Sequence, residues 1–329
     1  MDGPCVSILL PVFNGAPFLE AQIESILSQT WTDFELLILD DASTDASWNI
    51  IAAFADADAR IKPHRAPANR GQEECLRVLV DRSAQPLVMF CDQDDIWLPN
   101  KVELLLGAIG DAALAYGPSR LIDTAGNNLG RDLFAAVGAP IQGCDNLEIL
   151  YSNTVSAHAL LAKRAILCPA AFAPPKAGVL FDWRLAAAAC YTDGLRFVPG
   201  ATTLHRLHAG QRNNRALAGG PKKRRSAEVR RQCLSELAGF LAMHPALAAD
   251  KRALFAALVA CIANTHVRSS WHMTDRRMRS AAAEVAVKLC PDRAALAKFN
   301  RRVARMARGR LHPATLWSDI SRTRRAVLS

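Results

Sequence analysis

The stretch "PLVMFCDQDDIWLP" (residues 86–99) places three carboxylates, Asp92, Asp94 and Asp95, directly behind an apolar run. The apolar residues 86–91 predict a buried strand that ends at the acidic group. Carboxylates this close repel one another, so the arrangement indicates a positively charged partner. Mg²⁺ and Mn²⁺ bind proteins through one or two carboxylates and complete their coordination with phosphate oxygens and water. The stretch therefore predicts a divalent cation next to a phosphate group at the end of a strand.

Strand and helix patterns alternate around this stretch. Buried-strand runs and stretches with the apolar spacing of a helix follow one another at residues 6–13, 16–30, 34–40, 43–55, 60–66 and 71–82. This alternation predicts an α/β fold with a mostly parallel sheet flanked by helices. In such sheets ligands bind beyond the carboxyl ends of the strands. We therefore expect Asn14, Asp40 and Asp41 to lie at the same edge as the acidic group.

Beyond residue 99 the pattern is mixed, and beyond residue 212 it changes. The mixed part predicts helices at 99–109 and near 145–150, a strand near 112–116 and a strand, turn and strand at 196–208. Residues 1–212 hold 16 Lys and Arg against 24 Asp and Glu, a net charge of −8, whereas residues 213–329 hold 24 against 7, a net charge of +17. We predict an α/β domain over 1–212 and a basic α-helical region over 213–329.

The cysteines and the N-terminus indicate a compartment. The nine cysteines are scattered without a C-x-x-C pair, which argues against a zinc ribbon or a disulfide framework and fits a reducing cytosol. The N-terminal "MDGPCVSILLPVF" has no basic region ahead of its apolar run, so it shows no signal peptide. The apolar segment 253–263 is too short to span a membrane. We expect a cytoplasmic protein that is peripheral at the inner membrane if its basic helices dock there.

Several segments together resemble the family 2 inverting glycosyltransferases of the GT-A fold. They are "ILLPVFNG" (8–15), "SILSQTWTDFELLILDDASTD" (25–45), "NRG" (69–71), "CDQDDIWLPNK" (91–101) and "FDWRL" (181–185). Within that family the "CDQDDIW" segment is similar to rhamnosyltransferase-type enzymes of bacteria. The resemblance covers roughly residues 5–212, is absent from 213–329, and implies a Rossmann-like GT-A domain.

The resemblance also implies an activity and a site. A sugar, with rhamnose favoured, would move from a dTDP- or UDP-sugar to a hydroxyl of a glycan or lipid-linked acceptor in cell-surface polysaccharide biosynthesis. Mn²⁺ or Mg²⁺ would bind the diphosphate through Asp94 and His208, and Asp182 would be the catalytic base. Phe13 would stack on the nucleotide base and Asp41 would accept a hydrogen bond from it. The nucleotide-sugar pocket implied by the resemblance comprises Pro11, Phe13, Asn14, Asp40, Asp41, Asp92 and Gln93.

Each of these roles has a plainer alternative. Asp182 lies where a helix N-cap would lie, Phe13 could belong to the core, and His208 could be a strand-end histidine. Asp95 is interpreted as a cap for helix 99–109 or as a residue behind the metal ligands. The loop "NTVSAHA" (153–159) departs from the family pattern, so the acceptor is not predicted.

The basic region leaves two further alternatives. Most of its charge lies in "PKKRRSAEVRR" (221–231) and in 268–310, which predicts contact with an anionic membrane, the alternative being a solvated basic face. Aromatic residues are scarce in 268–310, with only Trp271 and Phe299, so no nucleic acid partner is expected. For the whole chain, the alternative to an enzyme is a non-catalytic nucleotide-fold protein whose basic tail docks on a polyanion or membrane. The presence of all the acids named above favours the enzyme.

Overall fold

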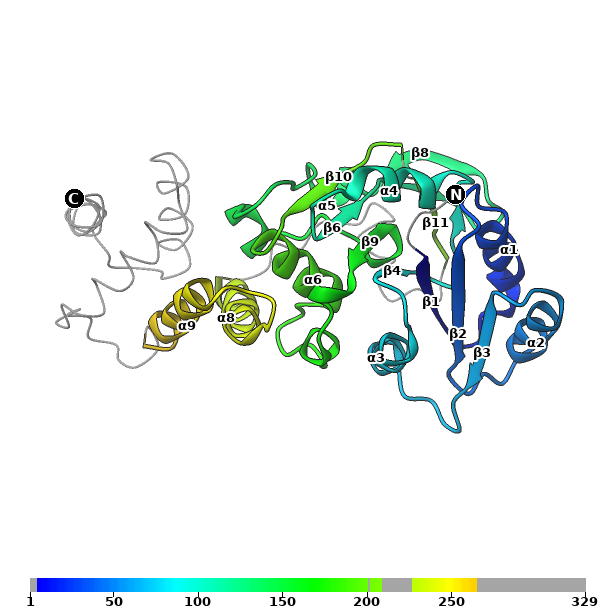
Figure 1. The fold of residues 1–329 in the computed structure, drawn as a ribbon, viewed down its shortest axis with the longest axis horizontal. Helices are drawn as coiled ribbons and strands as arrows, with labels where there is room; N and C mark the ends of the chain where they lie inside the picture. Colours follow the sequence, from blue (N-terminus) through cyan, green and yellow to red (C-terminus); the bar gives the residue numbers. More distant parts are fainter. Residues whose placement is uncertain (1–4, 201, 209–226, 265–329) are drawn as a thin grey trace. The chain divides into compact units, whose positions relative to one another are not determined.

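The computed structural model describes residues 5–200, 202–208 and 227–264 of the 329-residue chain (Figure 1). These residues form two compact units. The larger takes its described residues from within Met1–Cys144, Asn153–Pro174 and Leu180–Lys222, and the smaller from within Asp145–Ser152, Pro175–Val179 and Lys223–Ser329. The predicted domain boundary at residue 212 lies outside the described residues, so it stays a prediction.

The larger unit is built on a sheet of seven strands, counted over the described residues, in the order β10-β6-β9-β4-β1-β2-β3. Neighbouring strands run parallel except at β9, which is antiparallel to both β4 and β6. The predicted α/β fold with a mostly parallel sheet is therefore confirmed. The strands are β1 (Val6–Val12), β2 (Phe34–Asp40), β3 (Ile61–Arg65), β4 (Leu87–Phe90), β6 (Leu114–Tyr116), β9 (Leu160–Lys163) and β10 (Leu195–Phe197).

Helices α1 (Ala16–Leu27), α2 (Ser47–Ala57) and α3 (Gln72–Arg82) connect the first four strands. The chain moves outward from β1 to β3 through α1 and α2, and then returns through α3 to β4 on the other side of β1. Right-handed connections place α1 and α2 on one face of the sheet and α3 on the other, as Figure 1 shows. These elements match the predicted strands and helices of the first hundred residues.

Strand β1 shows why this sheet forms. A parallel strand covered by helices on both faces is apolar without alternation, because both of its faces are buried. Ile8, Leu9 and Leu10 are fully buried. Ile8 and Leu10 belong to the same hydrophobic core as Leu19 and Ile23 of α1. The carboxyl end of β1 is thereby fixed at the edge where the polar residues gather.

A second sheet lies beside this edge, with strand order β5-β11-β7-β8. Its strands are β5 (Ile96–Trp97), β7 (Ser119–Ile122), β8 (Asn128–Asp132) and β11 (Thr203–Arg206). β11 is parallel to β7 and antiparallel to β5, with Thr203 opposite Trp97. The predicted strand, turn and strand at 196–208 are confirmed as β10 and β11, which join different sheets. The pairing of β5 with β11 brings residues 203–208 beside the acidic group.

Shorter elements follow along the chain, all but one of them in the larger unit. Helix α4 (Lys101–Ile109) follows β5, and helix α6 (Phe181–Cys190) carries the "FDWRL" segment. The remaining elements in 134–172 are α5 (Phe134–Val137) and the 3₁₀ helices η1 (Leu147–Leu150), η2 (Ala157–Ala159), η3 (Arg164–Ile166) and η4 (Pro169–Phe172). The helix predicted near 145–150 is the 3₁₀ helix η1, which belongs to the smaller unit.

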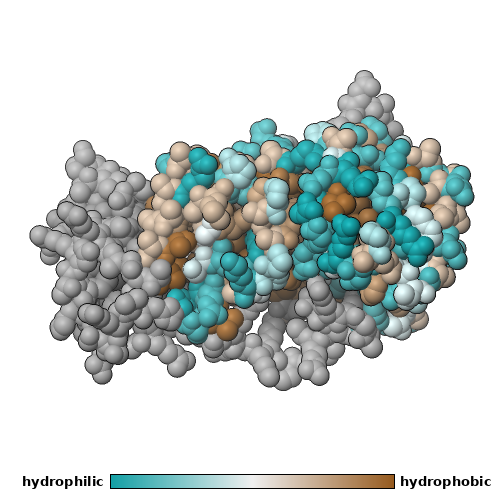
Figure 2. All heavy atoms as spheres, turned by 90° about the horizontal axis from the view of Figure 1, so that it is seen from below, coloured by the Kyte–Doolittle hydropathy of each residue, from teal (hydrophilic) through white to brown (hydrophobic). Residues whose placement is uncertain are grey.

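The smaller unit contains two long helices, α8 (Ala227–Met243) and α9 (Ala249–Asn264). They bury Leu237 and Leu241 of α8 and Phe255 of α9. Within the described residues, no helix has the length and apolar character that a membrane span requires. The other helices predicted for 213–329 lie outside the described residues. On the face that Figure 2 draws, hydrophobic side chains of the described residues form small separate areas among hydrophilic ones.

Candidate active site

The acidic group occupies the loop between β4 and β5. The hydrogen bonding of β4 to β1 ends where the Cys91 N–H donates to the Leu9 carbonyl at 3.0 Å. The chain then leaves the sheet, so Asp92, Asp94 and Asp95 lie at its carboxyl edge, as predicted. Asp94 and Asp95 are buried, and Asp92 is half-buried. Three carboxylates with so little exposure to solvent need positively charged partners. The larger unit supplies several such partners.

His208 is the partner of Asp94. Its Nε2 lies 2.7 Å from Asp94 Oδ2, and its ring lies 4.9 Å from the ring of Phe18. Burial, together with the charges of Asp95 and Asp92, raises the pKa of Asp94 above its usual range. A carboxylate oxygen and an imidazole nitrogen this close fit a cation such as Mn²⁺, which would relieve the same crowding of charge. The residues present therefore fit the predicted metal site, while its occupation in solution stays a prediction.

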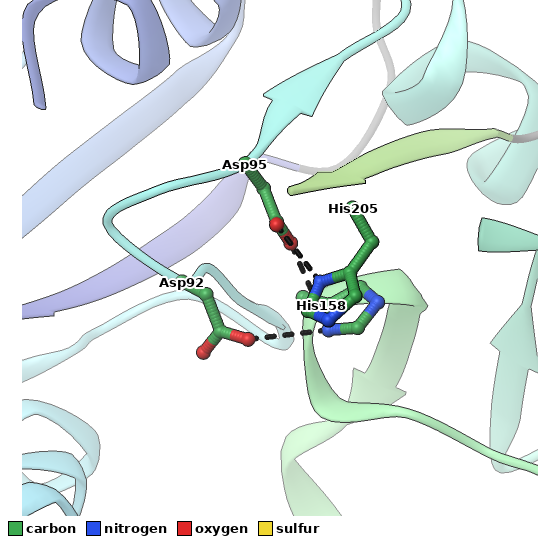
Figure 3. Close-up of side chains that lie close together, drawn as sticks. All are labelled: Asp92, Asp95, His158 and His205. Atoms are coloured by element: carbon green, nitrogen blue, oxygen red, sulfur yellow. Dashed lines mark hydrogen bonds and ion pairs between the residues drawn. The ribbon is translucent and has the colours of Figure 1, made fainter. Parts of the chain in front are cut away.

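Two further histidines face the other acids, and we call the four residues in Figure 3 the His–Asp cluster: Asp92, Asp95, His158 and His205. His205 Nδ1 lies 2.9 Å from Asp95 Oδ1, and His158 Nδ1 lies 3.2 Å from Asp92 Oδ2. The two imidazole rings stack with centroids 4.5 Å apart and planes 7° from parallel. The cluster joins the β4–β5 loop to η2 and β11.

The cluster residues perturb one another electrostatically. Burial alone would lower the pKa of His205, but the charge of Asp95 and its hydrogen bond raise that pKa to about 9. Burial would raise the pKa of Asp95, but the charges of His205 and His158 outweigh it and hold that pKa below its usual range. Asp95 and His205 thus favour each other's charged forms inside the protein.

Lys101 and Arg206 add positive charge behind the loop. The fully buried Lys101 ammonium donates to the His158 carbonyl at 2.5 Å and lies 3.5 Å above the Trp97 ring. Burial lowers its pKa to about 7. Arg206 donates from Nε to the Asp94 carbonyl at 2.9 Å and from its backbone N–H to Asp95 Oδ1 at 3.2 Å. These groups hold the acidic loop in place.

Two cap interpretations are wrong. The N-cap of α4 is Asn100, and Asp95 instead binds His205 and Arg206, so it does not cap that helix. The N-cap of α6 is Leu180, and Asp182 is the second residue of the helix. Neither acid is therefore explained by helix capping.

Asp182 lies close enough to the acidic loop for the charge of that loop to shift its pKa. Burial raises the pKa of Asp182 to about 7, and the charge of Asp92 contributes in the same direction. Hydrogen bonds from the backbone N–H groups of Trp183 and Ala157 partly oppose that shift. Ala157 directly precedes His158 of the cluster. The structure thus brings the predicted base to the predicted metal loop from about ninety residues away in sequence.

The acids that follow β2 are held differently. Asp41 accepts the backbone N–H groups of Arg70 and Gly71, each at 2.8 Å and on a separate carboxylate oxygen. Asp40 is fully buried, pairs with Arg65 at 3.1 Å and accepts from the Ser43 N–H at 3.3 Å. The carboxylates of Asp40 and Asp41 thus fix the loops around the predicted nucleotide pocket. The predicted contact of Asp41 with a base stays a prediction.

The end of β1 is clamped by the acidic loop. The Gln93 amide accepts from the Phe13 N–H at 2.8 Å and donates to the Phe13 carbonyl at 3.1 Å. Phe13 is 45% exposed, so its alternative role in the core is wrong and its ring is accessible to a ligand. Asn14 has a left-handed backbone, with φ at 49°, and its Oδ1 accepts from the Thr44 N–H at 2.8 Å. Pro11 lies opposite Leu39 in the β1–β2 pairing.

Sequence reasoning missed the roles of His158, His205, Lys101 and Arg206. His158 stands in the loop that departs from the family pattern, and His205 stands three residues before His208. These sequence positions were the only signals that could have drawn attention to the two histidines. The positions do not show that the histidines lie near the acidic loop, because that proximity depends on the pairing of β11 with β5.

Comparisons with known proteins identify relatives of the chain. Residues 7–156 match the family model "Glycosyl transferase family 2". The UDP-Glc:alpha-D-GlcNAc-diphosphoundecaprenol beta-1,3-glucosyltransferase WfgD of Escherichia coli is 30% identical over 125 residues, which cover 37% of this chain and 49% of that protein. The chain spans about half the length of the curated relatives it matches. Residues 7–156 are therefore similar to the glycosyltransferase domain of family 2.

Solved structures share the fold. TarS 1–349 of S. aureus, in complex with UDP-GlcNAc, matches with a TM-score of 0.56 at 14% identity, covering 98% of this chain and 92% of that one. The mannosyltransferase PcManGT from Pyrobaculum calidifontis, in complex with GDP-Man and Mn²⁺, matches with a TM-score of 0.50 at 16% identity, covering 98% and 85%. At such identities the likeness shows the fold alone, and it confirms the predicted GT-A fold.

Proposed function

We propose that the protein transfers a glycosyl group from a nucleoside-diphosphate sugar to a hydroxyl of a glycan or lipid-linked acceptor in polysaccharide biosynthesis. The observation that carries this proposal is the position of Asp182 at the same sheet edge as the acidic loop, with its pKa raised to about 7. A carboxylate with that pKa is suited to accept a proton at neutral pH. If Asp182 served only to begin helix α6, nothing would require its carboxylate to lie beside the acidic loop.

The residues divide the reaction between two sides. Asp182 accepts the proton of the acceptor hydroxyl as its oxygen attacks the anomeric carbon, and the bond to the diphosphate breaks on the opposite side. Attack from that side inverts the anomeric carbon and needs no covalent intermediate. When bound, a divalent cation held by Asp94 and His208 would neutralise the charge that develops on the departing diphosphate. Phe13 and Asn14, at the end of β1, border the nucleotide.

The relatives guide the choice of donor and acceptor. WfgD of Escherichia coli is named for UDP-Glc and for an acceptor on a diphosphoundecaprenol lipid, and the TarS structure holds UDP-GlcNAc. We therefore place UDP-sugars first. dTDP-rhamnose, which the "CDQDDIW" segment favours, stays the second donor to test.

The proposal is tested with purified full-length protein, Mn²⁺ and a GlcNAc-diphosphate-lipid acceptor. Release of UDP or dTDP is measured over a panel of UDP-Glc, UDP-GlcNAc and dTDP-rhamnose. Asp182→Asn should reduce transfer by about 10²- to 10⁴-fold while donor binding by calorimetry is retained. Asp193→Asn, at an exposed position near the end of the same helix, is the matched control and should behave like wild type. Donor binding without acceptor-dependent release from any donor would instead support the non-catalytic alternative.

We further propose peripheral contact with an anionic membrane through the basic segments 221–231 and 268–310. Of these, only 227–231 lie among the described residues. Sedimentation of full-length protein with anionic and with neutral vesicles tests the contact. Binding to anionic vesicles that falls as salt is raised is expected, and equal binding to both vesicle types would contradict it.

A further inference from the structure

The His–Asp cluster has the dimensions of a metal site. Its four ligand atoms all lie within 4.8 Å of one another. His205 Nδ1 lies 2.9 Å from Asp95 Oδ1, and His158 Nδ1 lies 3.7 Å from the other oxygen of Asp95, Oδ2, and 3.2 Å from Asp92 Oδ2. An ion with four tetrahedral bonds of 2.0–2.1 Å separates its ligand atoms by about 3.3 Å. Small movements of these side chains would therefore suffice to enclose an ion.

One oxygen in the cluster has no hydrogen bond. Asp95 is fully buried, and among the described residues nothing donates a hydrogen bond to its Oδ2. That atom faces His158 Nδ1 at 3.7 Å, beyond hydrogen-bonding distance. A buried carboxylate oxygen without a partner is costly, so it points to a ligand that the cluster would hold.

The cluster residues are also oriented from outside, as metal ligands are in proteins. His158 Nε2 lies 2.8 Å from Ser119 Oγ, which leaves Nδ1 facing the acids. Asp92 Oδ1 accepts from the Gln72 amide at 3.3 Å, which leaves Oδ2 facing His158. Asp95 Oδ1 accepts from the Arg206 N–H, which leaves Oδ2 directed inward.

The donor set selects the kind of ion. Two imidazole nitrogens and two carboxylate oxygens in a buried site suit Zn²⁺ and similar transition metals, whereas Mg²⁺ prefers oxygen ligands and keeps its water. Half-buried Asp92 gives the ion a path from solvent. The set shares no residue with Asp94 and His208, the pair assigned to the diphosphate cation.

We propose that the His–Asp cluster binds one transition-metal ion of the Zn²⁺ class, separate from the cation on the diphosphate. The ion would join three segments that are distant in sequence: the β4–β5 loop, η2 and β11. It would thereby fix the loop that carries Asp94. The alternative is a metal-free cluster in which a protonated His205 bonds to Asp95.

Zn²⁺ binding to full-length protein, stripped with a chelator and free of nucleotide, tests the proposal. Calorimetry and elemental analysis should show one tight equivalent, and Zn²⁺ should raise the melting temperature. His158→Gln and His205→Gln should lose that equivalent, whereas the matched control His208→Gln should keep it. Ser119→Ala, which leaves all four ligands in place, should weaken Zn²⁺ by about 10- to 100-fold. Circular dichroism verifies that each variant is folded.

Two further results decide the matter even if the histidine variants do not fold. With Co²⁺ bound to the wild-type protein, the visible absorption of a four-coordinate site is expected. Wild-type protein that retains no equivalent of Zn²⁺ or Co²⁺ without nucleotide would overturn the proposal. So would a His208→Gln variant that loses the tight ion. Neither measurement needs a sugar donor, so the outcome is independent of the proposed transferase activity.

Discussion

Two acidic groups lie at the same edge of the sheet and are neutralised in different ways. Asp40 and Asp41, after β2, accept backbone N–H groups and pair with Arg65. The acids after β4 are paired with His158, His205 and His208. Backbone N–H groups cannot leave or change their charge, whereas an imidazole can lose its proton and bind a metal.

The difference teaches which acids support the fold and which serve ligands. The Asp41 carboxylate holds the loop at residues 69–71, and the Asp40 carboxylate binds the Ser43 N–H and Arg65, so removing either leaves donors of the fold without their acceptor. The carboxylates after β4 repel one another, and a cation can replace the protons between them and the histidines. The first group should therefore be measured by stability and the second by binding and turnover.

The sharpest test of this contrast is the turnover of Asp94→Ala. Loss of its carboxylate should reduce transfer by about 10²- to 10³-fold, because the charge developing on the leaving group is less well neutralised. Its free energy of unfolding in urea should match or exceed the wild-type value, since a buried and repelled carboxylate is gone. The matched control is Asp111→Ala, at an exposed position, which should retain both activity and stability. Loss of stability without loss of turnover would break the comparison.

Asp41→Ala should show the opposite pattern. The N–H groups of Arg70 and Gly71 would lose their acceptors, at a cost of about 1–2 kcal/mol in the free energy of unfolding. Urea denaturation monitored by circular dichroism measures this loss. A variant as stable as the wild type would show that water replaces the carboxylate, and the assignment of Asp41 to the architecture would be wrong.

The pH dependence of Asp182 sharpens the contrast further. Because the proton acceptor must be ionised and its pKa is about 7, kcat/KM should fall about tenfold per pH unit below pH 7 and level off above it. The pH profile of the initial rate measures this limb. A rate unchanged between pH 5 and pH 8 would contradict the role of Asp182 as base.

The same shift predicts a stability effect of opposite sign. The folded pKa of about 7 lies above the ordinary value of 3.8, so the wild-type protein loses stability as pH rises from 3.8 to 7. Asp182→Asn carries no charge and avoids that loss. Its stability relative to wild type should therefore grow over this interval and stay constant above it, as thermal unfolding at several pH values would show. A difference that shrinks with rising pH would be inconsistent with a raised pKa.

The smallest expected effect concerns Gly15. A Cβ at this position would lie 2.6 Å from the Gln93 Oε1 and 2.7 Å from its Cδ, so Gly15→Ala should displace Gln93 from Phe13. We expect a loss of about 1 kcal/mol in the free energy of unfolding and a few-fold weaker binding of UDP by calorimetry. Gly107→Ala, in open space on α4, is the control that should not weaken binding. Unchanged UDP binding in Gly15→Ala would separate Gln93 from the nucleotide pocket.

The sequence predicted the elements whose signals are local. The apolar runs of β1, β2 and β4 and the helices between them follow from periodicity, and the acidic group follows from its place behind β4. The second sheet could not be predicted, because β5 is short and its pairing places Thr203 opposite Trp97, across more than one hundred residues. The positions of His158 and His205 depend on that pairing and on the antiparallel β9.

The interpretation of Asp95 as a helix cap failed for a related reason, whereas its alternative role behind the metal ligands is not contradicted. A carboxylate a few residues before a helix resembles a cap when only the chain neighbours are known. Its actual partners, His205 and the Arg206 N–H, come from β11. Long-range partners of this kind leave no local trace in a single sequence.

The hydrogen bonds between Gln93 and Phe13 have a consequence for communication within the site. The side-chain amide of Gln93 holds the backbone beside the exposed Phe13 ring and belongs to the same β4–β5 loop as Asp94. A nucleoside that bound at the end of β1 and ordered it would therefore also order the loop proposed to bind the cation. By thermodynamic reciprocity, the cation must favour the nucleoside to the same extent. The donor and its metal should thus be bound as a cooperative pair, with Gln93 as the coupling element.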